Sequence, residues 1–236
     1  EYSSAYINIS DALIKLEKFD QAKKYLDRSL SLDGPSPEIY SCLGNVNFYL
    51  EDYSTSISFY QKSIKIDQMF KESYFGLGRS LSKLDKWFEA IHFFKKAYKI
   101  DNKNIEYVKS LAYAEFKVGN LVSSIDLYSK AVEMQPDDYK LSLDFSLIYY
   151  ESGDIDKAID IIDQAIEESP GESLLYYRLV IYLMDAGRYK ESINVLESAL
   201  SLNFDNHDVL FDFVPNFESQ SALIRVINQF KNSGNR

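Results

Sequence analysis

The sequence predicts an all-α protein built from repeated pairs of antiparallel helices. Three observations lead to this fold class. Residue types recur every 34 positions, the apolar residues within each repeat have helical spacing, and the 236 residues include only 9 Gly and 5 Pro. Few Gly and Pro leave little material for loops, which favours helices joined by tight turns. A fixed period of this length is typical of a solenoid, in which each repeat buries its apolar face against its neighbours.

The first helix of each repeat is predicted from a large apolar position followed by a small one. The large position is occupied by Ile9, Leu43, Leu77, Leu111, Phe145 and Leu179. The next position is occupied by Ser10, Gly44, Gly78, Ala112, Ser146 and Val180. Gly within a helix costs about 0.5–1 kcal/mol relative to Ala, so Gly44 and Gly78 indicate a close approach of another helix.

A tight turn is expected after each first helix. In the last three repeats the turn position holds Gly119, Gly153 or Gly187, which is typical of a left-handed C-cap. The first three repeats hold Glu17, Glu51 and Asp85 there, which are less comfortable residues for that conformation. Pro136 and Pro170 end two of the repeats, because proline does not continue a helix.

The second helix is predicted from two small positions seven apart with a large apolar position between them. These residues share one helical face, so the small ones admit a neighbouring helix and the large one fills the space between. The first small position reads Ala22, Ser56, Ala90, Ser124, Ala158, Ser192. The large one reads Leu26, Tyr60, Phe94, Tyr128, Ile162, Leu196, and the second small one reads Ser29, Ser63, Ala97, Ala131, Ala165, Ala199.

Six repeats without insertion or deletion are expected over residues 1–205, at about 3–36, 37–70, 71–104, 105–138, 139–172 and 173–205. The pattern then breaks, because Pro215 interrupts the expected first helix and the apolar run around Leu223 has another register. We interpret residues 206–236 as degenerate C-terminal capping helices and a tail, since a terminal repeat must cover its neighbour's core. The alternative is that the last helix folds into the groove of the array.

These residues resemble the tetratricopeptide repeat, whose pattern is an aromatic, Leu-Gly, Ala, an aromatic and then Pro. Leu43-Gly44, Leu77-Gly78, Ala90 with Phe94, and Pro136 match it, whereas Val180 and Phe204 depart from it. The resemblance implies a right-handed superhelical α-solenoid whose first helices line a concave surface. It also implies a protein–protein interaction scaffold that binds a peptide or partner segment in this groove.

Under this resemblance, first-helix residues outside the packing positions would contact a partner. The predicted site is most apolar from Tyr113 to Met184, although these residues could instead pack against each other or against the C-terminal helix. The candidate residues are Asn45, Phe48, Tyr49, Phe75, Arg79, Lys109, Tyr113, Phe116, Leu143, Leu147, Tyr150, Tyr177, Arg178, Ile181 and Met184. The Lys and Asn arrangement with which some family members grip chaperone C-termini fits no register of this sequence.

Other functions find little support. A net charge of −10 predicts no binding of nucleic acid, and no apolar run is long enough for insertion into a membrane. One cysteine and two histidines give no metal site, no cofactor is expected, and no carboxylate pair indicates an enzyme. The chain begins without Met, so we expect a fragment or processed form, with a weak preference for a cytoplasmic location.

Two function classes therefore remain. In the first, the chain is a non-catalytic adaptor that binds a protein or peptide in the groove. In the second, it is a structural or self-associating repeat protein whose apolar surfaces form oligomer contacts. Monomer and weak homo-oligomer are both compatible with the sequence.

Overall fold

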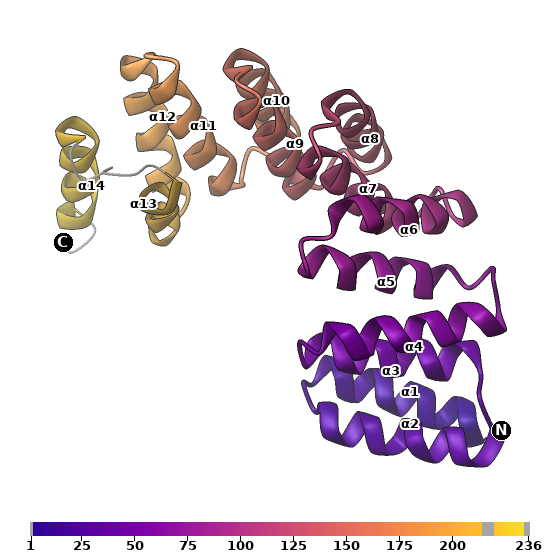
Figure 1. Cartoon of the computed structure of the whole chain (residues 1–236). Coiled ribbons are helices and arrows are strands. Elements are labelled where there is room, and N and C mark those ends of the chain that lie inside the picture. Colours follow the sequence, from indigo (N-terminus) through magenta and orange to yellow (C-terminus); the bar gives the residue numbers. More distant parts are fainter. Residues whose placement is uncertain (1, 214–219, 234–236) are drawn as a thin grey trace. The chain divides into compact units, whose positions relative to one another are not determined.

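The computed structural model describes residues 2–213 and 220–233, and these form only helices and the turns between them. The helices succeed one another as antiparallel pairs (Figure 1). Their bounds are α1 Tyr2–Lys15, α2 Phe19–Asp33, α3 Pro37–Tyr49, α4 Tyr53–Ile66, α5 Lys71–Lys83, α6 Trp87–Ile100, α7 Ile105–Lys117, α8 Leu121–Met134, α9 Tyr139–Glu151, α10 Ile155–Glu168, α11 Ser173–Asp185, α12 Tyr189–Leu202, η1 Phe204–Asp208, α13 Val209–Phe213 and α14 Ser221–Ser233.

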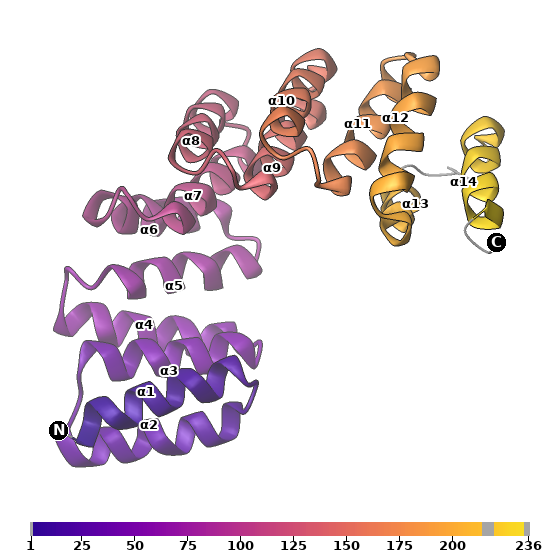
Figure 2. The ribbon, with the colours of Figure 1, turned by 180° about the vertical axis from the view of Figure 1, so that it is seen from behind.

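The chain forms two compact units, residues 1–127 and residues 128–236, and the division falls inside α8. Within the first unit, α1 packs on α2, α3 on α4 and α5 on α6, and each second helix also packs on the next first helix (Figure 2). The same arrangement holds for α9 to α12 in the second unit. First helices of successive pairs contact each other, as α1 does α3 and α3 does α5, so the stack is tighter on their side.

The small and large positions of the repeat form the core. Ala22, Ser56, Ala90, Ser124 and Ala158 of the first small position are completely buried, and the large residue that follows each is at most 2 % exposed in all six repeats. The apolar position of the first helix is similarly buried, from 1 % at Leu43 to 9 % at Phe145. Ile9 differs at 41 % exposed, because no second helix packs before α1 in the described chain. The predicted packing of the repeat is confirmed.

The turns within the pairs adopt the predicted left-handed conformation. Gly119, Gly153 and Gly187 have φ between 74° and 87°, and Glu17, Glu51 and Asp85 have φ between 56° and 60°. A residue with a Cβ is strained there, so three of these turns carry a cost that glycine avoids. Helix starts are stabilised by side chains: the Asp52 carboxylate accepts a hydrogen bond from Thr55 N at 3.1 Å, and Ser36 caps α3 just before Pro37.

The segment after α12 leaves the repeat pattern. η1 and α13 pack on α11, and α14 packs on α12. Leu210, Leu223 and Ile227 are buried in the same core as α11 and α12. The short segment 204–213 therefore covers the first helix of the last pair, while α14 lies on its second helix. Pro215 falls outside the described residues.

Candidate protein-binding face

The side of the first helices that is not used for packing is called the first-helix face below. On α3 and α5 it carries a cluster that we name the aromatic shelf: Asn45, Phe48, Tyr49, Phe75 and Arg79. The guanidinium carbon of Arg79 lies 4.2 Å from the ring centre of Phe48, 5.9 Å from that of Tyr49 and 5.8 Å from that of Phe75. Cation–π attraction to three rings holds this guanidinium in place. All five residues were predicted from the sequence, and the structure brings them together.

Within the shelf, Phe48 and Tyr49 differ in accessibility. Phe48 is only 7 % exposed and lies under the Arg79 guanidinium. The expectation that Phe48 would be accessible to a partner is therefore wrong. Tyr49 is 46 % exposed, and its ring stacks on Phe19 with a centroid distance of 5.8 Å and an interplanar angle of 6°. Tyr49 therefore presents a fixed aromatic surface to solvent.

Tyr60 of α4, a second helix, also contacts the aromatic shelf. The Tyr60 hydroxyl donates a hydrogen bond of 2.7 Å to Oδ1 of Asn45. The Tyr60 ring lies against Gly44 of α3 and Gly76 of α5. A Cβ on Gly44 would be 2.6 Å from a Tyr60 ring atom, and a Cβ on Gly76 would be 2.2 Å from one, so neither position accepts a side chain without a shift of the ring. Burial raises the pKa of the Tyr60 hydroxyl well above its usual value, so the group is a neutral donor. Sequence reasoning missed this residue because the hydrogen bond joins two helices.

A second aromatic group continues the first-helix face onto α7. Tyr113, 41 % exposed, meets the Trp87 ring edge-on at 5.6 Å. The ammonium of Lys117 lies 5.8 Å from the Trp87 ring centre and 5.9 Å from that of Tyr113. Phe116 and Lys109, the other predicted residues of α7, are half-buried. This group belongs to the same unit as the shelf, residues 1–127.

The predicted residues of α9 and α11 behave differently. Tyr177 and Ile181 are completely buried and Met184 is 4 % exposed, so the expectation that they line an open surface is wrong. The reason is the chain that follows α12. The Tyr177 hydroxyl donates a hydrogen bond of 2.9 Å to Asn203 O at the end of α12, η1 and α13 pack on α11, and the guanidinium carbon of Arg178 lies 3.9 Å from the ring centre of Phe213.

Leu143, Leu147 and Tyr150 remain half-buried on this side of α9. Tyr150 stacks on Tyr182 at 4.7 Å and donates a hydrogen bond to Asp185, and burial raises its pKa to about 12. Tyr113 and Phe116 lie in the first unit and these three residues in the second. The structure therefore does not define one apolar patch from Tyr113 to Met184.

The charge is unevenly divided between the two units. Residues 1–127 contain 17 basic and 17 acidic residues, whereas residues 128–236 contain 9 basic and 19 acidic ones. The whole net charge of −10 therefore belongs to the second unit. Electrostatic repulsion of nucleic acid is therefore expected only of residues 128–236. The first-helix face of the neutral unit carries cations, namely Arg79 on the shelf and the exposed Lys83 and Lys117.

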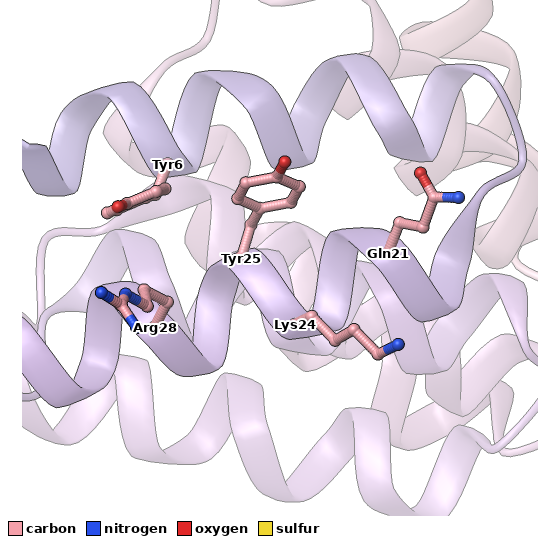
Figure 3. Close-up of a pocket in the computed structure, with 5 residues that line it drawn as sticks. All are labelled: Tyr6, Gln21, Lys24, Tyr25 and Arg28. Atoms are coloured by element: carbon pink, nitrogen blue, oxygen red, sulfur yellow. The ribbon is translucent and has the colours of Figure 1, made fainter.

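A shallow hollow of about 410 Å³ lies between α1 and α2 (Figure 3). Tyr6 and Tyr25 face each other across it with ring centres 5.9 Å apart, and Arg28 lies at its edge. The same positions one repeat later hold Tyr40, Phe59 and Lys62, with the ammonium of Lys62 4.8 Å from the Phe59 ring. The hollow is thus the first copy of a packing arrangement that recurs with the repeat, and its lining suggests no chemistry of its own.

Within the described chain, no group of His, Cys, Asp and Glu side chains has the arrangement of a metal site. None of the described helices has both the length and the apolar composition to cross a membrane. One buried charge is structural: Glu115, 1 % exposed, pairs with Lys95 at 2.6 Å and accepts a hydrogen bond from Asn120 at 2.7 Å. Sequence analysis did not single out Glu115.

Models of the tetratricopeptide repeat match residues 3–35, 71–104, 115–180 and 174–206, which together cover more than half of the sequence. The chain belongs to the tetratricopeptide-repeat family. A search of curated proteins gave no significant match.

Solved structures of other repeat proteins are similar in fold. PilF of Pseudomonas aeruginosa is 15 % identical, with a TM-score of 0.73, over 94 % of this chain and 97 % of that one. The MamA protein is 23 % identical, with a TM-score of 0.63, over 76 % and 98 % of the two chains. YrrB, described as a repeat protein with an unusual peptide-binding site, is 17 % identical, with a TM-score of 0.61, over 79 % and 96 %. At these identities the likeness shows the fold.

Proposed function

We propose that this chain is a non-catalytic interaction scaffold, and that it binds an extended peptide segment of a partner protein on the first-helix face of α3, α5 and α7. The observation that carries the proposal is the aromatic shelf. It combines an exposed, immobilised ring at Tyr49 with an oriented guanidinium at Arg79 and an oriented amide at Asn45. The family is in general one of protein-interaction repeats, and the peptide-binding site of YrrB lies on a similar fold.

The shelf is suited to a peptide because its apolar and polar groups are already fixed. A ring that stacks on Phe19 and a guanidinium that stacks on Phe48 lose little conformational entropy on binding. Burial of a few apolar side chains contributes about 1.5–3 kcal/mol each. After the costs of association, an affinity of about micromolar follows.

Selection from a displayed library of random 12-residue peptides, followed by fluorescence anisotropy with the selected peptides, tests this proposal. We expect Tyr49→Ser to weaken binding about tenfold or more, since it removes an apolar contact of the size given above. Phe88→Ser is the matched control, because Phe88 is 79 % exposed but begins a second helix, α6. Equal binding by wild type and Tyr49→Ser would refute the assignment of the face.

A second function, self-association, has one observation in its favour. Phe88 and Val122 are 79 % and 76 % exposed and stand 34 positions apart at the starts of α6 and α8. Neighbouring exposed apolar residues mark contact surfaces in many proteins. Light scattering after size exclusion tests this alternative: a dimer that Phe88→Ser and Val122→Ser convert to monomer would support it, and a monomeric wild type would oppose it.

A further inference from the structure

Arg79 differs from the basic side chains that form ion pairs in the described chain. Lys71 pairs with Asp101, Lys95 with Glu115, Lys157 with Asp154 and Arg188 with Glu191, all within 3 Å. Among the residues that the structure describes, no carboxylate pairs with Arg79 and no hydrogen bond engages its guanidinium. It is held by rings alone, although the chain has 36 acidic residues.

Stacking on a ring leaves the donors of a guanidinium available. The guanidinium carbon of Arg79 lies over the Phe48 ring, 4.2 Å from its centre, and none of the five N–H donors of the group has a hydrogen-bond acceptor among the described residues. A planar fork of donors fits the two oxygens of a carboxylate, and hydrogen bonds between charged groups are stronger than neutral ones. Arg79 is therefore an oriented anion-binding group that has no anionic partner among the residues that the structure describes.

Asn45, the neighbouring polar residue of the shelf, likewise offers hydrogen-bond donors. Oδ1 of Asn45 accepts the hydrogen bond of Tyr60, so the amide NH2 of Asn45 is left to donate, and no described residue accepts from it. Asn45 and Arg79 occupy the same position of successive repeats, on the adjacent helices α3 and α5. Both therefore offer donors, and the exposed Lys83 lies one turn further along α5.

The electrostatic surroundings admit a negatively charged ligand. The first unit is neutral overall, with 17 basic and 17 acidic residues. Within the shelf, Tyr49 supplies an exposed apolar surface that a carboxylate alone would not use. A ligand that satisfies both features has an acidic side chain next to an aromatic or aliphatic one.

We propose that the partner segment is an acidic peptide, and that a side-chain carboxylate of it binds Arg79 while an adjacent apolar side chain rests on Tyr49. This inference rests on the proposed function and specifies its ligand. Peptides selected from the random 12-residue library should accordingly be enriched in Asp and Glu beside Leu, Ile or aromatic residues.

The decisive measurement is a pair of exchanges on one selected peptide. Replacing the peptide's Glu by Gln should weaken binding to the wild-type protein about tenfold, and should have little effect on binding to Arg79→Gln, because the lost hydrogen bonds are then absent from both. Arg28→Gln is the control, since it removes the same charge from the same unit but lies at the edge of the α1–α2 hollow. Arg79→Lys keeps the charge without the planar fork and should recover only part of the affinity.

The outcomes separate the two proposals. If selected peptides bind the first-helix face without acidic enrichment, or if the Glu-to-Gln exchange costs equally in wild type and Arg79→Gln, the acidic ligand is refuted and the scaffold function stands. If no peptide is selected at all, the proposed function fails and the acidic ligand with it. Circular dichroism melts of each variant establish that the fold is retained.

Discussion

The contact of Tyr60 with Gly44 and Gly76 gives the sharpest prediction for the structure of the first-helix face. A Cβ on Gly76 would lie 2.2 Å from Cζ, 2.4 Å from Cε1 and 2.6 Å from the hydroxyl oxygen of Tyr60, far below ordinary contact. Tyr60 is 1 % exposed and lies between two helices, so it has no free space into which to move. We expect Gly76→Ala to be destabilising.

The magnitude follows from two opposing contributions. Overpacking of a buried site costs about 1–3 kcal/mol, and a contact this short belongs at the upper end. Ala instead of Gly within a helix returns about 1 kcal/mol. The expected net loss is about 2 kcal/mol, which at a urea m-value of about 2 kcal/mol/M lowers the unfolding midpoint by about 1 M.

Urea unfolding followed by tryptophan fluorescence measures this loss in the right unit. Trp87 is the only tryptophan and lies in α6, within residues 1–127. The matched background is Tyr60→Leu, in which the shorter side chain removes the clash, so that Gly76→Ala should there be neutral or stabilising. A neutral or stabilising Gly76→Ala in the wild-type background would show that Tyr60 does not pass between α3 and α5.

Three further predictions concern the turns, the buried ion pair and the acidic face of α10. Glu51→Gly should stabilise the first unit by about 0.5–1 kcal/mol, because the φ angle of Glu51 is +60°. Gly119→Ala should destabilise it by a similar amount, because the φ angle of Gly119 is +83°. Unchanged urea midpoints, followed by Trp87 fluorescence, would contradict both expectations. Lys95→Met should lower the free energy of unfolding by about 3 kcal/mol, because it leaves the buried Glu115 without its cation. Glu115→Gln should lower it by only about 1 kcal/mol. The reverse order in the same urea assay would refute the pairing. Partial desolvation, together with Asp160, Glu167 and Glu191, outweighs the opposing effect of Arg188 and raises the pKa of Asp163. The ionised form of Asp163 therefore destabilises the folded state once the pH is above the pKa of the unfolded chain, and this destabilisation disappears on acidification. Asp163→Asn should therefore raise the thermal midpoint at pH 7, and the gain should shrink as the pH falls towards 4; a gain independent of pH would exclude this cause.

The sequence predicted the repeat well because every repeat imposes the same environment on the same position. Ala22, Leu26 and their equivalents are buried in all six pairs, and such a constraint is visible as a period of 34 residues. The positive φ of Glu17, Glu51 and Asp85 was likewise predictable, since glycine occupies the same position in the later repeats. Packing that repeats leaves a periodic pattern in one sequence.

Features that occur once leave no such pattern. The Tyr60 ring of α4 reaches Asn45 of α3 only because Gly76 of α5 has no Cβ to block it. This arrangement involves three helices at once, so the spacing within one helix does not reveal it. Tyr177, Ile181 and Met184 occupy face positions of the repeat, but they are buried because the segment 204–213 departs from the repeat and packs on α11. The expected accessibility of these three residues was therefore wrong, whereas a binding site on the first helices stays a prediction.

The central claim is that a peptide binds the first-helix face at the aromatic shelf. Photo-crosslinking tests it most directly, with benzoylphenylalanine placed at position 49 or at position 88 and a selected, labelled peptide as the probe. Both native side chains are exposed, at 46 % for Tyr49 and 79 % for Phe88, so a missing crosslink from position 88 cannot be explained by poorer access. We predict a crosslink from position 49 that excess unlabelled peptide abolishes, and none from position 88. A crosslink from position 88 alone would place the binding surface on the second helices and contradict the account.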